Sequence, residues 1–232
     1  MLAVLGAPAT VARSQTTSVQ FDVALGGVKI GVFWMDGSVN PRAYTASAGF
    51  ESTGLIGQIA TVKFQMLARG RLRDGRFAPD RYSEDAVVGR RSSSAVLTYE
   101  NGVPSLEGGK LGMEEADPAV AAQQQGTLDP LTALFVMMRD QPAEGICQID
   151  QFVFDGARRT RTVMNDLSRD GADILCRGQF HRLEGYSQKD LQRGRVVDLV
   201  LRYLPQGDGM TVSAAEFSSP RGTVRLTRRW TR

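Results

Sequence analysis

Histidine is almost absent from this chain of 232 residues, and His181 is the single example. A hydrolase that uses a Ser-His-Asp triad would need His181 as its base. The Gly-x-Ser-x-Gly pattern of a nucleophile elbow and the Ser-x-x-Lys pattern of serine transpeptidases do not occur in the sequence. We therefore expect His181 to be a half-exposed structural residue at a strand end, and we expect no catalytic residues.

Cysteine is also scarce, since only Cys147 and Cys176 are present. Zinc sites take at least three good ligands at characteristic spacings, and no such set can be assembled. Glycine-rich phosphate-binding loops are missing too, so we expect neither a metal nor a cofactor. In an exported protein the two thiols would pair, which would stabilise the fold by roughly 3–4 kcal/mol on the chain-entropy model. In a cytosolic protein the alternative is two separate buried thiols.

Long hydrophobic runs are lacking. The longest, residues 131–138, is shorter than the ~18 apolar residues that a membrane-spanning helix needs, so we expect no transmembrane segment. Residues 1–12 carry no charge and are rich in small and aliphatic side chains, with Thr10 and Ala12 placed as before a signal-peptidase cut. We interpret them as the remainder of a secretory signal peptide whose basic region is missing; the alternative is a frayed cytosolic terminus.

Lysine contributes only four of the 28 basic side chains, so arginine carries most of the positive charge. The net charge of +3 is mild and does not require a nucleic-acid partner, and we expect none. Arginine is concentrated in residues 158–161 and 225–232. The second stretch resembles a tail for phosphate, anionic lipid or nucleic acid. The alternative is a solvated strand face followed by a charged terminus.

Turn signals, in contrast, are abundant. Six Asp-Gly or Asn-Gly dipeptides lie along the chain, and such pairs supply the positive φ angles that type I′ hairpin turns require. The segments between them alternate apolar and polar side chains or are rich in β-branched residues, which predicts about eleven to thirteen antiparallel strands. The dipeptides are Asp36-Gly37, Asp74-Gly75, Asn101-Gly102, Asp155-Gly156, Asp170-Gly171 and Asp208-Gly209. The predicted strands are residues 19–25, 28–35, 44–50, 66–73, 77–85, 95–100, 147–154, 159–164, 173–181, 196–204, 210–217 and 222–228.

One clear helix interrupts the strands. Asp129 is a good N-cap, Pro130 suits the first helical position, and Pro142 prevents continuation. Residues 131–138 place apolar side chains at i, i+3, i+4 and i+7 with almost no polar face, so we expect the helix to be largely buried at one end of a curved sheet. A weaker pattern predicts a short helix after residue 53 that runs into a strand near residue 62.

The domain organisation follows from these elements. Residues 107–127 are rich in glycine, glutamate and glutamine and have few large apolar side chains, so we predict a long surface excursion there. The remainder fits a single β-rich domain over residues 13–232. We predict a mainly β fold with one strongly curved antiparallel sheet, an open barrel or β-spiral, and one or two short helices.

The order of short motifs along the chain is more informative than any one of them. The motifs are Gly26-Gly27-Val28-Lys29-Ile30-Gly31, Tyr44, Ser52-Thr53-Gly54-Leu55, Arg69-Gly70, Asp74-Gly75, Phe77-Ala78-Pro79, Leu128-Asp129-Pro130-Leu131-Thr132-Ala133-Leu134, Phe154-Asp155-Gly156 and Val197-Asp198-Leu199-Val200-Leu201. This succession resembles the exported bacterial family catalogued as domain of unknown function 3108. The resemblance implies a periplasmic, β-rich protein with no established enzymatic activity. In architecture the chain also resembles envelope integrity protein B, a periplasmic β-spiral with one disulfide.

These observations lead us to expect a non-enzymatic periplasmic protein of the cell envelope that binds an envelope partner or an amphiphile. A curved sheet with an apolar interior offers a concave site for such a ligand. The alternatives are an interaction scaffold without a small ligand, which would use strand edges or the basic tail, and an envelope hydrolase that would depend on His181. The candidate cavity-lining residues, each of which is alternatively an ordinary core residue, are Phe21, Val23, Phe33, Leu134, Phe135 and Met138.

Overall fold

A single antiparallel sheet makes up most of the molecule. The computed structural model describes residues 14–54, 57, 61–109 and 117–230. Within these residues thirteen strands pair in one curved sheet whose edges do not pair with each other, which confirms the predicted mainly β fold. The strands are β1 (Gln15–Leu25), β2 (Val28–Val39), β3 (Ala43–Ser52), β4 (Val62–Arg73), β5 (Arg76–Val88), β6 (Arg91–Glu100), β7 (Val103–Gly109), β8 (Ile149–Phe154), β9 (Arg159–Asp170), β10 (Asp173–Glu184), β11 (Val196–Gln206), β12 (Gly209–Ser219) and β13 (Gly222–Arg228). The helices are the 3₁₀ helix η2 (Ala121–Gln123), α2 (Pro130–Met138) and α3 (Gln188–Gln192).

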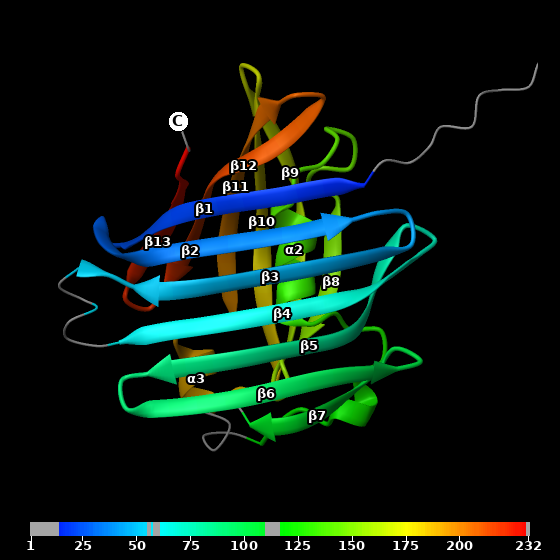
Figure 1. Cartoon of the computed structure of the whole chain (residues 1–232). Helices are drawn as coiled ribbons and strands as arrows, with labels where there is room; N and C mark the ends of the chain where they lie inside the picture. The colour runs from blue at the N-terminus through cyan, green and yellow to red at the C-terminus, as the bar shows by residue number, and fades with distance from the viewer. Residues whose placement is uncertain (1–13, 55–56, 58–60, 110–116, 231–232) are drawn as a thin grey trace, which may run out of the picture.

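The sheet consists of two runs of sequential strands that meet at the ends of the chain. Its order is β7-β6-β5-β4-β3-β2-β1-β13-β12-β11-β10-β9-β8, so the first strand pairs with the last. Figure 1 shows β1–β7 as one layer, with β9–β12 crossing behind it and α2 between the two layers. The sheet therefore curves around α2, and β7 and β8 form its two edges.

Most of the predicted turns lie at hairpins. Asp74-Gly75 joins β4 to β5 and Asn101-Gly102 joins β6 to β7, and all four residues have positive φ, as a type I′ turn requires. Asp170-Gly171 and Asp208-Gly209 each lie one position away from the two-residue loop between their strands. The β9–β10 loop begins at Gly171, with a φ of 60°, and the β11–β12 loop begins at Gly207, with a φ of 56°. Asp155-Gly156 begins the longer loop between β8 and β9, residues 155–158.

The turn predicted at Asp36-Gly37 is wrong, because β2 continues through it to Val39. A Cβ atom on Gly37 would lie 2.5 Å from the ring of Phe135, so this glycine makes room for α2 rather than for a turn. The chain reverses instead at Asn40, whose side-chain oxygen accepts hydrogen bonds from the backbone N–H of Arg42 (2.8 Å) and of Ala43 (2.9 Å).

The predicted helix is confirmed in its position and its cap. The α2 helix spans Pro130–Met138, and Asp129 accepts a hydrogen bond from the backbone N–H of Thr132 at 2.8 Å. The strand expected near residue 62 begins at Val62, whereas most of the weaker helical pattern before it lies outside the described residues. The proposed signal-peptide remnant, residues 1–12, also lies outside them.

Residues 117–128 run between the two edges of the sheet. The backbone N–H of Gly126 donates to the carbonyl of Gly102, next to β7, at 2.8 Å. On the other side Leu128 forms two backbone hydrogen bonds with β8, one to Phe152 and one to Phe154, each 2.9 Å long. This segment therefore links the neighbourhood of one edge to the other edge.

Most side chains of residues 117–127 are exposed, as in the predicted surface excursion of residues 107–127, but parts of this segment belong to the fold. Residues 107–109 belong to β7, and Gln124 and Thr127 are buried. The Gln124 amide nitrogen donates to Glu184 at 3.1 Å and the Thr127 hydroxyl donates to the Gln124 backbone carbonyl at 2.7 Å, whereas Oε1 of Gln124 has no hydrogen-bond partner among the described residues. Composition indicated exposure, but hydrogen-bonded polar side chains can be buried. The middle of the predicted excursion, residues 110–116, lies outside the described residues.

Candidate functional site

A buried polar cluster fixes the beginning of α2. Asp129 is fully buried and accepts a hydrogen bond from the Thr132 hydroxyl at 2.6 Å, in addition to the backbone bond of the cap. The same hydroxyl lies 2.7 Å from the phenolic oxygen of Tyr44 on β3. Burial raises the pKa of Asp129 to about 6, although the hydrogen bonds from Thr132 partly oppose this shift. The cluster thus anchors the N-terminus of α2 to the first half of the sheet.

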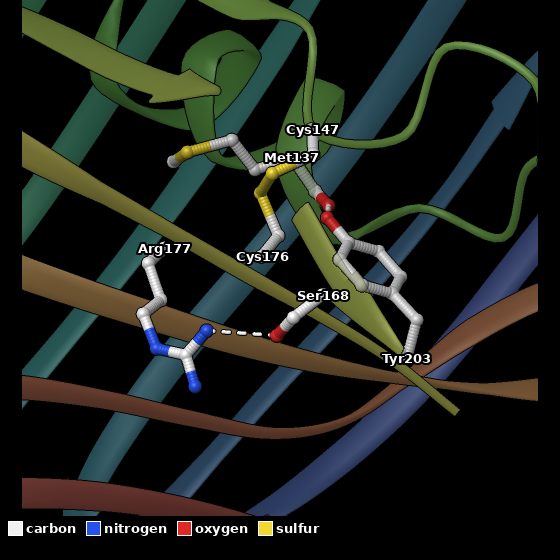
Figure 2. Close-up of a disulfide and its surroundings, with 6 residues drawn as sticks. All are labelled: Met137, Cys147, Ser168, Cys176, Arg177 and Tyr203. Atoms are coloured by element: carbon white, nitrogen blue, oxygen red, sulfur yellow. Dashed lines mark hydrogen bonds between the residues drawn. A yellow bond between two sulfur atoms is a disulfide. The ribbon is translucent and has the colours of Figure 1, made fainter. Parts of the chain in front are cut away.

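The other end of α2 is attached to the second half of the sheet. The Tyr203 hydroxyl of β11 donates to the carbonyl of Met137 at 2.7 Å, and Figure 2 shows this pair beside a disulfide. The disulfide joins Cys147, in the segment between α2 and β8, to Cys176 of β10. The predicted pairing of the two cysteines is therefore present, and both residues are buried.

One face of α2 is sealed in an aromatic core. The Phe135 ring lies 6.5 Å from the Tyr44 ring and 6.2 Å from the Phe77 ring. Five of the six candidate cavity residues belong to this packed core, where each is at most 5% exposed: Phe21, Val23, Phe33, Phe135 and Met138. The sixth, Leu134, is only partly buried and lies on a different face of the helix.

That face lines an apolar cavity of about 450 Å³ between α2 and the second half of the sheet. The apolar residues of its walls are Pro130, Ala133, Leu134 and Met137 of α2, Met66 of β4, Val153 of β8, Phe180 of β10, Val197 and Leu199 of β11, Phe217 of β12, and Pro220 in the turn after β12. Thr160 and Thr162 of β9 also line the cavity, which therefore brings together residues from seven elements. Of these residues the sequence interpretation identified only Leu134.

Three of the largest lining side chains remain half-exposed: Phe180, Leu199 and Phe217. In β11 the alternation continues along one face, yet Leu201 and Tyr203 are buried while Leu199 is not. The period-two pattern could have identified Leu199 as an inward-facing residue. It could not have distinguished the part of that face that is packed from the part that borders the cavity.

The border of the cavity carries one cationic side chain, Arg182 of β10. Its guanidinium donates to the backbone carbonyls of Asp190 and Gly194 at 2.7 and 2.8 Å and lies 5.5 Å from the centre of the Tyr186 ring. These contacts hold the guanidinium in place, and Ser218 and Ser219 line the same cavity. An apolar interior with one fixed cation at its border can hold an aliphatic chain and its polar end together.

His181 is half-buried in β10, opposite Arg161 of β9 and Val196 of β11. Within the described part of the chain, no group of three or more His, Cys, Asp or Glu residues is placed to hold a metal ion. No helix built from these residues has both the length and the apolar character needed to cross a membrane.

Comparison with known families places this architecture. The family described as "Protein of unknown function (DUF3108)" matches residues 20–169. The chain belongs to the DUF3108 family. This confirms the resemblance inferred from the order of the motifs, and no curated protein matches the chain.

A solved structure with a similar fold is described as a β-barrel-like protein of domain of unknown function DUF1849 from Brucella abortus. It shares 9% sequence identity with this DUF3108 chain, with a TM-score of 0.52, and the alignment covers 94% of this chain and 96% of the other. At this identity the likeness concerns the fold alone. It supports the description of the sheet as curved and barrel-like.

The DUF3108 match covers the core side of the helix but not the whole cavity. Residues 20–169 include most of β1, all of β2–β8, α2 and most of β9. The cavity wall formed by Phe180, Val197, Leu199 and Phe217 lies beyond residue 169. The packed side of α2 therefore belongs to the matched region, whereas the opposite cavity wall does not.

The C-terminal basic stretch of this DUF3108 protein is part of the sheet rather than a free tail. Arg225 pairs with Glu216 of the neighbouring strand at 2.7 Å, and Arg229 pairs with Asp22 of β1 at 2.7 Å. The Arg228 guanidinium lies over the Trp230 ring, and its Cζ atom is 4.6 Å from the ring centre. These contacts favour the strand-face interpretation for residues 225–230, whereas residues 231–232 lie outside the described residues.

Proposed function

We propose that this DUF3108 protein is an exported, non-enzymatic protein of the cell envelope that holds the apolar part of an amphiphile in the cavity beside α2. The observation that carries the proposal is the cavity. Its volume of about 450 Å³ lies within the range of small-molecule sites, ~300–1,000 Å³. Its wall leaves Phe180, Leu199 and Phe217 half-exposed, and burying apolar surface is worth about 25 cal/mol per Å². Burial of this surface would contribute favourable free energy to the binding of an apolar ligand.

The border of the cavity favours an amphiphile with an anionic group. Arg182 is held by two backbone carbonyls and by Tyr186, so little side-chain entropy would be lost when its guanidinium receives a carboxylate or phosphate. The hydroxyl group of Ser218 offers a further donor, whereas that of Ser219 already donates to the Gly222 carbonyl at 2.6 Å.

The disulfide supports the expected compartment. Both cysteines of the chain are consumed by it, and disulfides persist in oxidising compartments such as the bacterial periplasm. The family and the structural neighbour are both described as of unknown function, so the activity class rests on the cavity.

The test is a native mass spectrum of the protein purified from a bacterial periplasm under non-reducing conditions. We expect an adduct of lipid size that organic extraction removes. The spectrum also reports whether Cys147 and Cys176 have lost two hydrogens. An adduct-free mass, together with no uptake of a fluorescent fatty acid, would contradict the proposal and favour the interaction scaffold.

Two variants of the same helix make the test specific. Leu134→Trp should fill the cavity and abolish the adduct, because Leu134 lines it. Val136→Trp is the matched control, since Val136 borders a different groove, between α2 and β8, and should keep the adduct. A second filling variant, Leu199→Trp, enters from the opposite wall and replaces Leu134→Trp if that helix variant misfolds.

A further inference from the structure

The hairpin formed by β4 and β5 carries an unusual concentration of positive charge. Its exposed arginines are Arg69, Arg71 and Arg73 of β4 and Arg76 and Arg81 of β5. Arg71 pairs with Asp80 at 2.8 Å. For the other four, no ion pair or side-chain hydrogen bond occurs within the part of the chain that the structure describes. Four of the five arginines of this hairpin therefore have no carboxylate partner among the described residues, although Asp85 of β5 lies on the same outer face.

Several arginines on other strands have a carboxylate partner on a neighbouring strand. Arg161 of β9 forms two hydrogen bonds with Asp150 of β8, at 2.6 and 2.7 Å. Arg225 of β13 faces Glu216 of β12 directly across the sheet. In both places a neighbouring strand supplies the counter-charge, as Asp80 of β5 does for Arg71, whereas Arg69 and Arg81 face each other.

Two of the unpaired arginines lie side by side. Arg69 of β4 is the direct cross-strand partner of Arg81 of β5, on the same outer face. Like charges directly opposite each other destabilise an antiparallel pair. The strand spacing of about 4.8 Å brings the two guanidiniums within reach of one small anion. Such an anion would convert this repulsion into two charge-assisted contacts.

The arginine pair borders a hollow on the outer face of β2–β5. This hollow has a volume of about 530 Å³ and is formed because its floor consists of small side chains. Thr45 of β3 is the cross-strand partner of Arg69, and its hydroxyl lies 3.1 Å from the Ser38 hydroxyl of β2. At the β2 end of the hollow, Asp36 already accepts a hydrogen bond from Ser18 at 2.6 Å. The cationic end and the acidic end of the hollow are thus separated across the sheet.

We propose that this hollow binds a tetrahedral oxyanion between Arg69 and Arg81, namely the phosphate group of a small ester or of a lipid headgroup. Guanidinium groups form paired, charge-assisted hydrogen bonds with phosphate oxygens. The hydroxyls of Thr45, Ser47 and Ser83 line the same hollow and can donate to the remaining oxygens. Arg73 and Arg76, opposite each other at the end of the hairpin, add positive potential that attracts the anion. This site is independent of the cavity beside α2.

The first experiment is a titration of the ¹⁵N-labelled full chain with inorganic phosphate at constant ionic strength, with chloride as the balancing anion. We expect saturable amide shifts centred on Thr45, Arg69 and Arg81. Arg69→Gln and Arg81→Gln should each weaken binding by about tenfold, the usual effect of removing a hydrogen bond to a charged group. Shifts no larger than those produced by chloride alone would overturn the proposal.

Arg225→Gln is the matched control, because it removes the same charge from an exposed arginine of the outer face whose partner is Glu216. It lies on β13, four strands from β4, and charges this far apart are largely screened, so phosphate affinity should change by less than about twofold. An equal loss in Arg225→Gln and Arg69→Gln would show a response to net charge and would contradict a local site. The double variant Arg69→Gln/Arg81→Gln should melt no lower than the wild type without phosphate, because it removes a like-charge pair.

Vesicle flotation separates the two sources of phosphate. If the ligand is a lipid headgroup, the wild type should float with phosphatidylglycerol vesicles and not with phosphatidylcholine vesicles, and Arg69→Gln/Arg81→Gln should abolish flotation while Arg225→Gln retains it. If phosphate binds in the titration but no vesicle does, the site takes a small phosphate ester. Flotation that survives the double variant would rule out the arginine pair as the headgroup site.

Discussion

The two sides of α2 are packed in opposite ways. Toward β2–β5, Phe135 is sealed among Tyr44 and Phe77, and Gly37 provides the space for its ring. Toward β8–β12, Leu134 and Met137 face a cavity. A helix that is apolar on nearly every side can thus hold the fold together with one face and leave room with another. The difference lies in what the sheet offers, since the helix presents large apolar side chains to both sides.

The strongest test of this comparison removes one side chain from each face. Phe135→Ala should lower the free energy of unfolding by about 3–5 kcal/mol, because Phe135 is fully buried and its loss leaves a void. Leu134→Ala should cost only about 1 kcal/mol, because Leu134 is partly exposed and already borders empty space. Urea denaturation of both variants measures the difference. Equal costs would mean that the cavity side is packed as tightly as the core side.

The disulfide provides the next test, because it ties the segment after α2 to the open side. Replacing Cys147 and Cys176 together with alanine should lower stability by about 2–4 kcal/mol. Amide hydrogen exchange should then accelerate more in β10 and β11 than in β3, because β3 contacts the helix through the Asp129 cluster instead. Reduced wild-type protein is the control and should behave in the same way. Uniform acceleration in all strands would show that the two sides do not differ in local stability.

A smaller, pH-dependent effect should distinguish the anchored side. Because the pKa of Asp129 is raised to about 6, the folded state binds this proton more tightly than the unfolded state does. The contribution of Asp129 to stability is therefore greatest below pH ~4 and declines by up to about 1.4 kcal/mol per pH unit as the pH rises to ~6. The wild type should become more stable relative to Asp129→Asn as the pH falls through this window. A difference that stays constant in urea titrations between pH 4 and pH 7 would contradict the buried-carboxyl account.

The sequence was most informative where the relevant forces are local. Asp129 and Pro130 determine the start of α2 through contacts within one helical turn, so its limits could be predicted. The hairpins at Asp74-Gly75 and Asn101-Gly102 follow from the positive φ of adjacent residues. In these places neighbouring residues alone account for the conformation.

Prediction was wrong where distant residues decide the outcome. Gly37 has the sequence context of a turn, but its role is to accommodate Phe135, nearly a hundred positions later in the chain. The cavity could not be located, because Leu199 and Leu201 follow the same alternation and differ only in what faces them across the interior. In the sequence, arginine is concentrated in residues 158–161 and 225–232, so these stretches were the candidate basic surfaces. The like-charged pair of the proposed anion site is instead Arg69 and Arg81 of β4 and β5, which only strand register brings together.

The pairing of β1 with β13 has a consequence for the order in which the molecule can assemble. Every other pairing in the sheet joins strands that are neighbours in the sequence, and such local contacts form quickly. The β1–β13 ladder joins Phe21 to Arg228 and must close a loop that contains almost the entire chain. Loop-closure entropy makes this the costliest pairing to nucleate. Until residues 222–228 have been synthesised, the two runs of hairpins have no strand between them, so continuity of the sheet is a property of the completed polypeptide.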